Sequence, residues 1–209
     1  MRIKLILHEI DPDDSVLDIG CVNHTAFAEG KDEWLHKYLY DKANYVLGID
    51  CAESEVEKLK NRGYNVVVAD AENMELETRF DVIVAGELIE HLSNSGRFLE
   101  GCKEHLKGNG KLILTTPNVW WVLRMISVVF KGFAELHEEH TCWYDKKTLI
   151  QLLTRHGFKI EKVEFVPARR GSILCAFTRW LYRLGLKQLG GHTLFVVCRK
   201  RISESGNEH

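Results

Sequence analysis

The sequence predicts an α/β domain built on a mainly parallel sheet. Short apolar segments rich in Val, Ile and Leu alternate along the chain with segments of helical periodicity, as expected when helices connect parallel strands. Continuous apolar runs of this kind are typical of strands that helices cover on both faces. Several runs also end in an acidic residue or a glycine, which is how a ligand cleft is built at the carboxyl edge of a sheet. The predicted strands are 16–19, 45–49, 65–69, 81–85, 111–115, 159–166 and 192–198.

Four helices are predicted between these strands, at 31–42, 53–61, 96–106 and 145–156. Each segment places its apolar residues on one helical face. Gly63 and Gly157 follow two of them and are suited to end a helix. Asp145 or Thr148 is available to cap the start of the last one, and a turn is expected at 108–110.

The composition indicates one globular domain over residues 1–209, with 45% hydrophobic and 28% charged residues. The formal net charge of -2 provides no basic field, so no nucleic-acid partner is expected. The six cysteines have no paired short spacing, which favours reduced, mostly buried thiols in a cytoplasmic protein. We expect neither a signal peptide nor a membrane span, because no apolar run is long enough.

Acidic residues and glycines stand where the first four strands end. Because the carboxyl ends of parallel strands meet at one edge of a sheet, we expect these residues to line a single cleft. Glycine permits positive φ and close backbone approach, and a carboxylate can accept from two hydroxyls at once. In strand order the residues are Asp18, Gly20 and Cys21, then Asp50, then Asp70, Ala71 and Glu72, then Gly86 and Glu87.

This ordered set, over about residues 16–158, resembles the class I S-adenosylmethionine-dependent methyltransferases. The resemblance implies a doubly wound, Rossmann-like sheet of seven strands with the last strand antiparallel, and S-adenosyl-L-methionine as cofactor. It implies that Asp18, Gly20 and Cys21 meet the methionine tail and that Asp50 accepts from the ribose hydroxyls. It also implies that Asp70, Ala71 and Glu72 meet the adenine, and that Gly86 and Glu87 lie under the transferring methyl group.

The loop after the first strand departs from the family pattern. It reads Gly20-Cys21-Val22-Asn23-His24, where the family often has three alternating glycines. Asn23 is among the residues that tolerate a left-handed backbone, so the turn can survive. The departure nonetheless leaves an alternative open, which is a non-catalytic binding or scaffold protein with a degenerate cofactor loop. A nicotinamide-dependent dehydrogenase is disfavoured, because no Gly-x-Gly-x-x-Gly follows the first strand.

Two further segments, 86–92 and 139–144, resemble those of small-molecule O-methyltransferases such as the quinone-biosynthesis enzymes. The resemblance favours a small-molecule or lipid-linked acceptor methylated at oxygen. His91 and His140 are the candidate catalytic bases, since imidazole titrates near neutral pH; each could instead serve only to hold the backbone. His137 and His140 would share a helical face, but we expect no metal, because exposed His and Glu clusters are common without one.

The alternation of strands and helices is interrupted at about 119–144 and 167–191. Both segments are apolar and aromatic with scattered basic residues, and we expect them to supply inserted helices after strands five and six that form the acceptor pocket or a lid. A helix of this kind can pack on its own domain, contact a membrane surface or form a homodimer. The arm before Val16 is short, which makes it a poor candidate for a lid.

Overall fold

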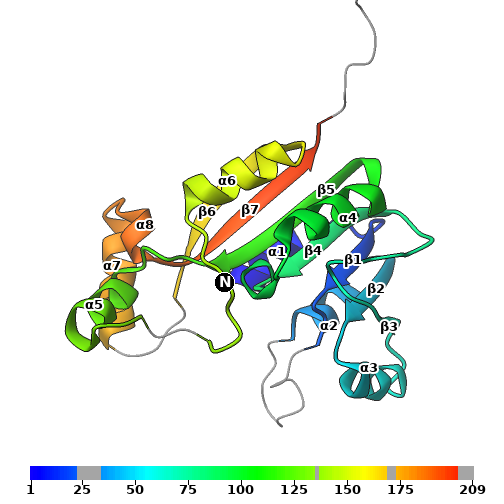
Figure 1. Cartoon of the computed structure of the whole chain (residues 1–209), viewed down its shortest axis with the longest axis horizontal. Coiled ribbons are helices and arrows are strands. Elements are labelled where there is room, and N and C mark those ends of the chain that lie inside the picture. Colours follow the sequence, from blue (N-terminus) through cyan, green and yellow to red (C-terminus); the bar gives the residue numbers. More distant parts are fainter. Residues whose placement is uncertain (23–33, 135–136, 169–172, 202–209) are drawn as a thin grey trace, which may run out of the picture.

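The computed structural model describes residues 1–22, 34–134, 137–168 and 173–201. Within these ranges seven strands form one sheet in the order β3-β2-β1-β4-β5-β7-β6 (Figure 1). The first five strands pair in parallel, whereas β7 runs antiparallel to both β5 and β6. The mainly parallel sheet with an antiparallel last strand is therefore confirmed. The strands are β1 (Ser15–Ile19), β2 (Tyr45–Asp50), β3 (Val66–Val68), β4 (Phe80–Gly86), β5 (Leu106–Pro117), β6 (Phe158–Pro167) and β7 (Gly191–Lys200).

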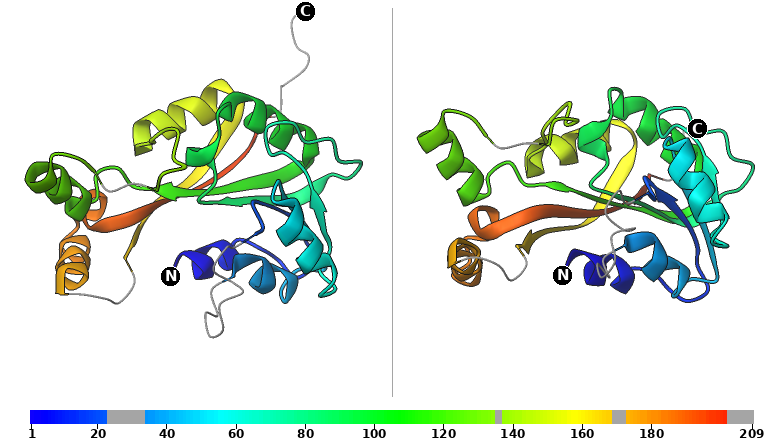
Figure 2. Two further views of the ribbon diagram at one scale, coloured as in Figure 1. Left: turned by 60° about the horizontal axis from the view of Figure 1, so that its bottom comes forward. Right: turned by 90° about the horizontal axis from the view of Figure 1, so that it is seen from below.

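Helices lie on both faces of this sheet, with α1 and α2 on one side and α4 and α6 on the other (Figure 2). The described residues contain no helix long and apolar enough to cross a membrane. The helices are α1 (Arg2–His8), α2 (Leu35–Tyr40), α3 (Glu53–Lys60), α4 (Ser95–His105), α5 (Val122–Lys131), α6 (Lys146–Arg155), α7 (Ile173–Arg183) and α8 (Lys187–Gly190), with a 3-10 turn η1 (Ile89–His91). Helix α5 falls within 119–144, and α7 and α8 fall within 167–191.

Neighbouring residues of each strand enter different cores, because successive side chains of a strand point to opposite faces. In β4, Val82 and Val84 pack with Ile6 of α1, whereas Ile83 packs with Phe98 of α4. All five side chains are fully buried, and each burial of this size contributes roughly 1.5–3 kcal/mol. Residues 82–85 of β4 are apolar throughout because both of their faces are covered.

Three elements differ from the sequence predictions. Helix α1 was not predicted, and α2 begins at Leu35, so Trp34 is extended rather than helical; residues 31–33 of that predicted helix lie outside the described ranges. The turn expected at 108–110 is instead part of β5, where a register shift opposite Phe80 and Val82 absorbs the extra residues as a bulge. A glycine suits position 110, since a Cβ there would lie 3.0 Å from the Phe80 carbonyl oxygen.

Asn118, directly after β5, joins four elements. Its side-chain amide donates to the carbonyl oxygens of Gln188 (2.6 Å) and Gly191 (2.7 Å), at α8 and at the start of β7. Its Oδ1 accepts from the backbone N–H of Trp120 at 3.1 Å, and its carbonyl oxygen accepts from Arg124 of α5 at 2.7 Å. Asn118 is 1% exposed. Its hydrogen bonds fix the start of the apolar segment 119–144 and the end of the apolar segment 167–191 against the sheet.

Asn118→Ala should lower the free energy of unfolding by roughly 1–3 kcal/mol, because it leaves the buried Gly191 carbonyl and the part-buried Gln188 carbonyl without this donor. Chemical denaturation followed by circular dichroism measures the change. Asn109→Ala, on an exposed part of β5, is the matched control and should change stability by less than about 0.5 kcal/mol. Equal effects of the two substitutions would contradict the role given to Asn118.

Candidate active site

The sheet register brings the predicted strand ends together. Ile19 pairs with Ile49 and with Ala85, and Gly86 pairs with Thr115. Gly20, Asp50, Gly86 and Thr116 therefore follow one another along the carboxyl edge of β1, β2, β4 and β5. This is the edge at which open α/β sheets bind ligands.

The loop after β1 is closed onto β2 by its backbone. Gly20 has a φ of 75°, a conformation that favours glycine, and its N–H and that of Cys21 both donate to the Ile49 carbonyl oxygen. The N–H of Val22 donates to Asp50 Oδ2 at 2.9 Å. The Cys21 thiol is buried beneath the loop, and this burial raises its pKa. The thiol packs against Gly48 and lies near both Asp18 and Asp50. Asn23 and His24 lie outside the described residues.

Asp18 is held in a buried pair. Its Oδ2 lies 2.9 Å from Nδ1 of His36, and the two residues are 2% and 0% exposed. His36 comes from α2, a helix of one and a half turns. The carboxylate at the end of β1 is thus already partnered on one oxygen, and that contact orients it.

The acidic residues after β2 and β3 differ in exposure. Both oxygens of Asp50 accept from backbone N–H groups, those of Val22 and Ala52. Asp70 is exposed and accepts from the N–H of Glu72 at 2.9 Å, which forms a tight turn. The Glu72 carboxylate in turn accepts from the N–H of Ser93. Ala71 lies within this turn, half-buried.

Glu87 has a strained backbone. Its φ is 58°, the one positive value among the described non-glycine residues, and such strain gathers at functional sites. Two hydrogen bonds hold the conformation, since the Glu87 N–H donates to the carbonyl and hydroxyl oxygens of Thr115. The carboxylate lies 3.5 Å from the Arg2 guanidinium, and burial raises its pKa. Gly86 beside it faces Leu35, whose side chain would lie 3.2 Å from a Cβ there.

Glu90 is a buried carboxylate without a hydrogen-bond partner. It is 1% exposed, and neither of its side-chain oxygens has a partner among the described residues. Burial, followed by the neighbouring Glu87, raises the pKa of Glu90 to about 8. The Thr116 hydroxyl lies beside it, and both this hydroxyl and the buried Trp121 Nε1 lack a hydrogen-bond partner within the described part of the chain. The carboxyl ends of β4 and β5 therefore hold polar groups that are prepared for a ligand.

The two candidate bases lie together. The rings of His91 and His140 are 4.6 Å apart and perpendicular, and both are half-buried. Burial lowers the pKa of both imidazoles, which favours the neutral forms. The segment around His137 forms a turn and not a helix, so the predicted shared helical face is wrong; the turn still brings the His137 and His140 rings to 5.8 Å.

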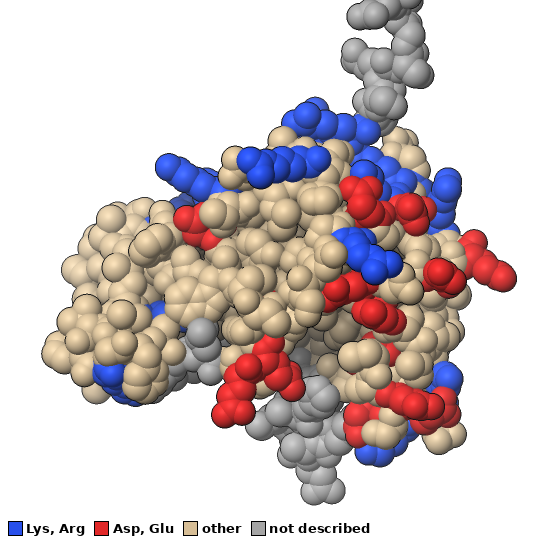
Figure 3. Space-filling model, in the orientation of Figure 1, with Lys and Arg blue, Asp and Glu red and all other residues tan. Residues whose placement is uncertain are grey.

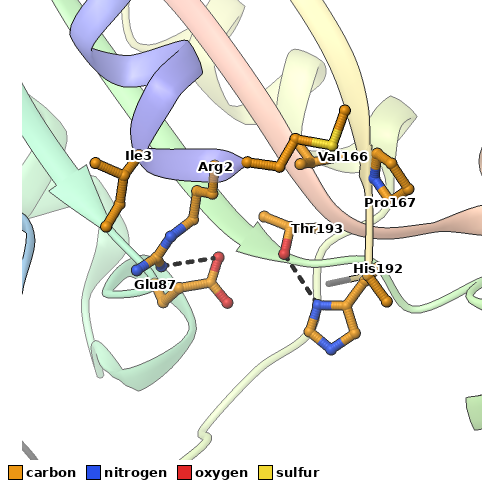
Figure 4. Close-up of a pocket in the computed structure, with 9 residues that line it drawn as sticks. Arg2, Ile3, Glu87, Val166, Pro167, His192 and Thr193 are labelled. Atoms are coloured by element: carbon orange, nitrogen blue, oxygen red, sulfur yellow. Dashed lines mark hydrogen bonds and ion pairs between the residues drawn. The ribbon is translucent and has the colours of Figure 1, made fainter. Parts of the chain in front are cut away.

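Three cationic or titratable residues of the site were not predicted. Arg2 and Glu87 form an ion pair at 3.5 Å that lines a cavity of about 380 Å³, which His192 also lines (Figure 4). Arg124 of α5 is the second of these residues. Burial lowers the pKa of its guanidinium, and the nearby carboxyl groups of Glu87 and Glu90 partly offset that effect. Burial and the two arginines lower the pKa of His192. A lone arginine inside the apolar helix α5 was the available sequence signal for Arg124.

The amino-terminal arm contributes to this cavity. Met1, Arg2 and Ile3 line one side, and Val166, Pro167 and Thr193 line the other. Arg2 at the start of α1 lies beside Glu87 at the carboxyl end of β4, so the arm forms part of the cavity wall (Figure 4). That the arm is a poor candidate for a lid stays a prediction.

Comparison with known proteins places this geometry in context. A family profile described as a methyltransferase domain matches residues 2–163. (S)-Coclaurine N-methyltransferase of Papaver somniferum is 32% identical over 106 residues, which cover 51% of this chain and 30% of that protein. Ubiquinone biosynthesis O-methyltransferase of Rhodopseudomonas palustris is 31% identical over 120 residues, which cover 53% of this chain and 47% of that protein. The chain thus spans a third to a half of the length of these relatives.

A solved structure shows that the fold is shared over nearly the whole chain. The S-adenosylmethionine-dependent methyltransferase from Archaeoglobus fulgidus superimposes with a TM-score of 0.69 at 18% identity, covering 95% of this chain and 91% of that one. The profile match runs from α1 into β6 and so includes every strand end described above. The chain belongs to the methyltransferase-domain family.

Proposed function

We propose that this protein transfers a methyl group from S-adenosyl-L-methionine to an oxygen atom of a small-molecule or lipid-linked acceptor. The observation that carries the proposal is the group of buried, unpaired polar atoms of Glu90, Thr116 and Trp121 beside the strand ends that carry Gly20 and Asp50. Buried polar atoms are costly when unpaired, so a site that retains them is suited to a polar ligand. Similarity to a ubiquinone O-methyltransferase supports oxygen, whereas similarity to the coclaurine enzyme would support nitrogen.

The cofactor would lie across the ends of β1, β2 and β4. Gly20 and the Cys21 backbone would border the methionine tail, with Asp18 beside them. Asp50 would accept from the ribose hydroxyls through lone pairs that its two backbone donors leave free. The turn of Asp70, Ala71 and Glu72 would meet the adenine, and Gly86 with Glu87 would face the sulfonium.

The acceptor would occupy the cavity between Arg2, Glu87 and His192. Methyl transfer is a displacement at carbon from an excellent leaving group, so positioning and exclusion of water provide most of the catalysis. A hydroxyl acceptor must also lose its proton. His91 and His140, whose neutral forms are favoured, and the buried Glu90 are the groups that would assist this step.

Helices α5 and α7 present an apolar surface that fits an anionic membrane. They lie side by side beyond the carboxyl edge of β5 (Figure 1), and this end of the molecule is mainly uncharged in Figure 3. Residues 119–134 and 173–190 contain five Lys or Arg and no Asp or Glu. Apolar side chains bordered by basic ones are the pattern of interfacial helices. The α5–α7 apolar surface consists of Met125, Ile126, Val129, Phe130, Phe133, Ile173, Leu174, Phe177 and Trp180.

Calorimetric titration with S-adenosylmethionine and S-adenosylhomocysteine should show binding in the micromolar range. Asp50→Ala should weaken it at least about tenfold, because a charged hydrogen bond is lost. Asp41→Ala removes an exposed carboxylate paired with Lys37 and should leave affinity unchanged. A folded wild-type protein that binds neither compound would instead support the non-catalytic scaffold alternative.

His91→Ala and His140→Ala should each lower turnover by about 10²-fold or more while cofactor affinity stays nearly unchanged. Turnover is measured as S-adenosylhomocysteine release in a screen of phenolic, sugar and lipid-linked acceptors. His156→Ala, which removes a histidine paired with Glu100 away from the site, is the control. Normal turnover in both site variants would show that neither imidazole takes part.

Vesicles containing phosphatidylglycerol should bind the protein more tightly than vesicles of phosphatidylcholine alone. Val129→Ser combined with Phe130→Ser should weaken this binding at least about tenfold, because these side chains are 78% and 82% exposed and would enter the interface. Val68→Ser, on the distant edge strand β3, is the control. Self-association that the same double substitution abolishes, without vesicle binding, would assign the surface to a homodimer.

A further inference from the structure

Glu90, His91 and His140 place one ligand atom each within 4.8 Å of one another. Two of these residues follow β4 on the turn η1, and the third comes from the loop before α6. A carboxylate oxygen and two imidazole nitrogens are a ligand set that proteins use for divalent metal ions.

The backbone holds the two segments together at this point. The N–H groups of Thr141 and Cys142 both donate to the carbonyl oxygen of Glu90, at 2.9 and 3.3 Å. The Thr141 hydroxyl also donates to the Leu92 carbonyl oxygen at 2.7 Å. His140 is therefore anchored by its neighbours on the residues that carry the other two ligand atoms, so the arrangement does not depend on a chance side-chain contact.

The Glu90 carboxylate supplies an independent indication that a ligand belongs here. It is 1% exposed, neither oxygen has a hydrogen-bond partner among the described residues, and it faces the two imidazoles. A buried carboxylate requires a proton, a cation or several hydrogen bonds. The nearby Arg124 directs its guanidinium to the Asn118 carbonyl oxygen instead.

We propose that Glu90, His91 and His140 bind a divalent first-row transition-metal ion. Imidazole favours Zn²⁺, Fe²⁺ and related ions over Mg²⁺, and two histidines with one glutamate leave positions open for water or substrate. The catalytic role of the ion rests on the proposed function. There it would bind the acceptor hydroxyl and favour loss of its proton to solvent, while the oxygen–methyl bond forms and the sulfur–methyl bond breaks. The oxidation state of the metal does not change.

A second group of His91, His137 and Glu139 also brings three ligand atoms together. Its outer members are open to solvent, with His137 63% and Glu139 71% exposed. Exposed side chains keep their hydration, so this outer group has no unmet requirement for an ion. Because the two groups share His91 alone, substitutions at their other members distinguish them.

Titration of EDTA-treated, full-length protein with MnCl₂ tests the proposal. The electron paramagnetic resonance signal of free Mn²⁺ should decrease until one ion is bound per chain, and pulsed spectra should show coupling to ¹⁴N of histidine. Zn²⁺ should compete for the same site. Glu90→Gln, which keeps the shape of the side chain, and His140→Ala should each weaken Mn²⁺ binding at least about tenfold. Each variant is first shown to be folded by its circular dichroism spectrum and melting transition.

His137→Ala combined with Glu139→Ala is the matched control and should leave Mn²⁺ affinity within about twofold. Absence of Mn²⁺ and Zn²⁺ binding, or binding that only the control variant removes, would overturn the proposal. The titration contains neither cofactor nor acceptor. Loss of the metal site is therefore distinguishable from failure of the proposed methyl transfer, which the S-adenosylmethionine titration reports.

Discussion

The site depends on the hydrogen bonds that converge on Asn118. A parallel strand that ends at a ligand cleft must send its chain onward without blocking that cleft, and here one amide side chain determines the direction. It binds the chain entering α5, Gln188 of α8 and the first residue of β7, and it is itself buried. Arg124 lies near Glu87 and Glu90, while its guanidinium donates to the carbonyl oxygen of Asn118. The position of Arg124 therefore follows from the way β5 ends.

The charges of the site are balanced but incompletely paired. Arg2 lies near Glu87, and Arg2 and Arg124 both act to lower the pKa of that carboxyl against the larger raising effect of burial, yet Glu90 accepts no side-chain hydrogen bond from the residues that the structure describes. The unpaired oxygens of Glu90 therefore remain available to a ligand. The strained backbone of Glu87 also lowers stability, and the hydrogen bond to Thr115 offsets part of that cost. The folded protein is thus less stable than it would be if these polar groups were fully paired, and the groups remain available to a ligand.

The fold and the strand-end residues could be predicted because they follow from local patterns. Alternating apolar runs locate β1, β2, β4 and β5, and their parallel pairing brings Gly20, Asp50 and Gly86 to one edge. Features that depend on distant packing could not be predicted in this way. Glu90 is preceded by apolar residues and followed by a histidine, which gives no sign that its side chain is buried, and the distant loop at Thr141 packs against its backbone. Arg2 and His192 come from opposite ends of the chain and meet because α1 and β7 flank the same cavity. The helical face expected for His137 and His140 was wrong because the segment is tied down as a turn.

The pair between Asp18 and His36 links two processes that are usually treated apart. A helix of six residues does not persist alone in water, and α2 is held chiefly by burial of His36 and Leu39. Its order therefore depends in part on a carboxylate at the end of β1. A ligand that hydrogen-bonds Oδ2 of Asp18 in place of His36 would destabilise α2. A ligand that binds Asp18 without breaking this contact would stabilise the helix. Thermodynamic reciprocity then requires the converse: whatever loosens or tightens α2 changes the affinity of the cleft by the same factor.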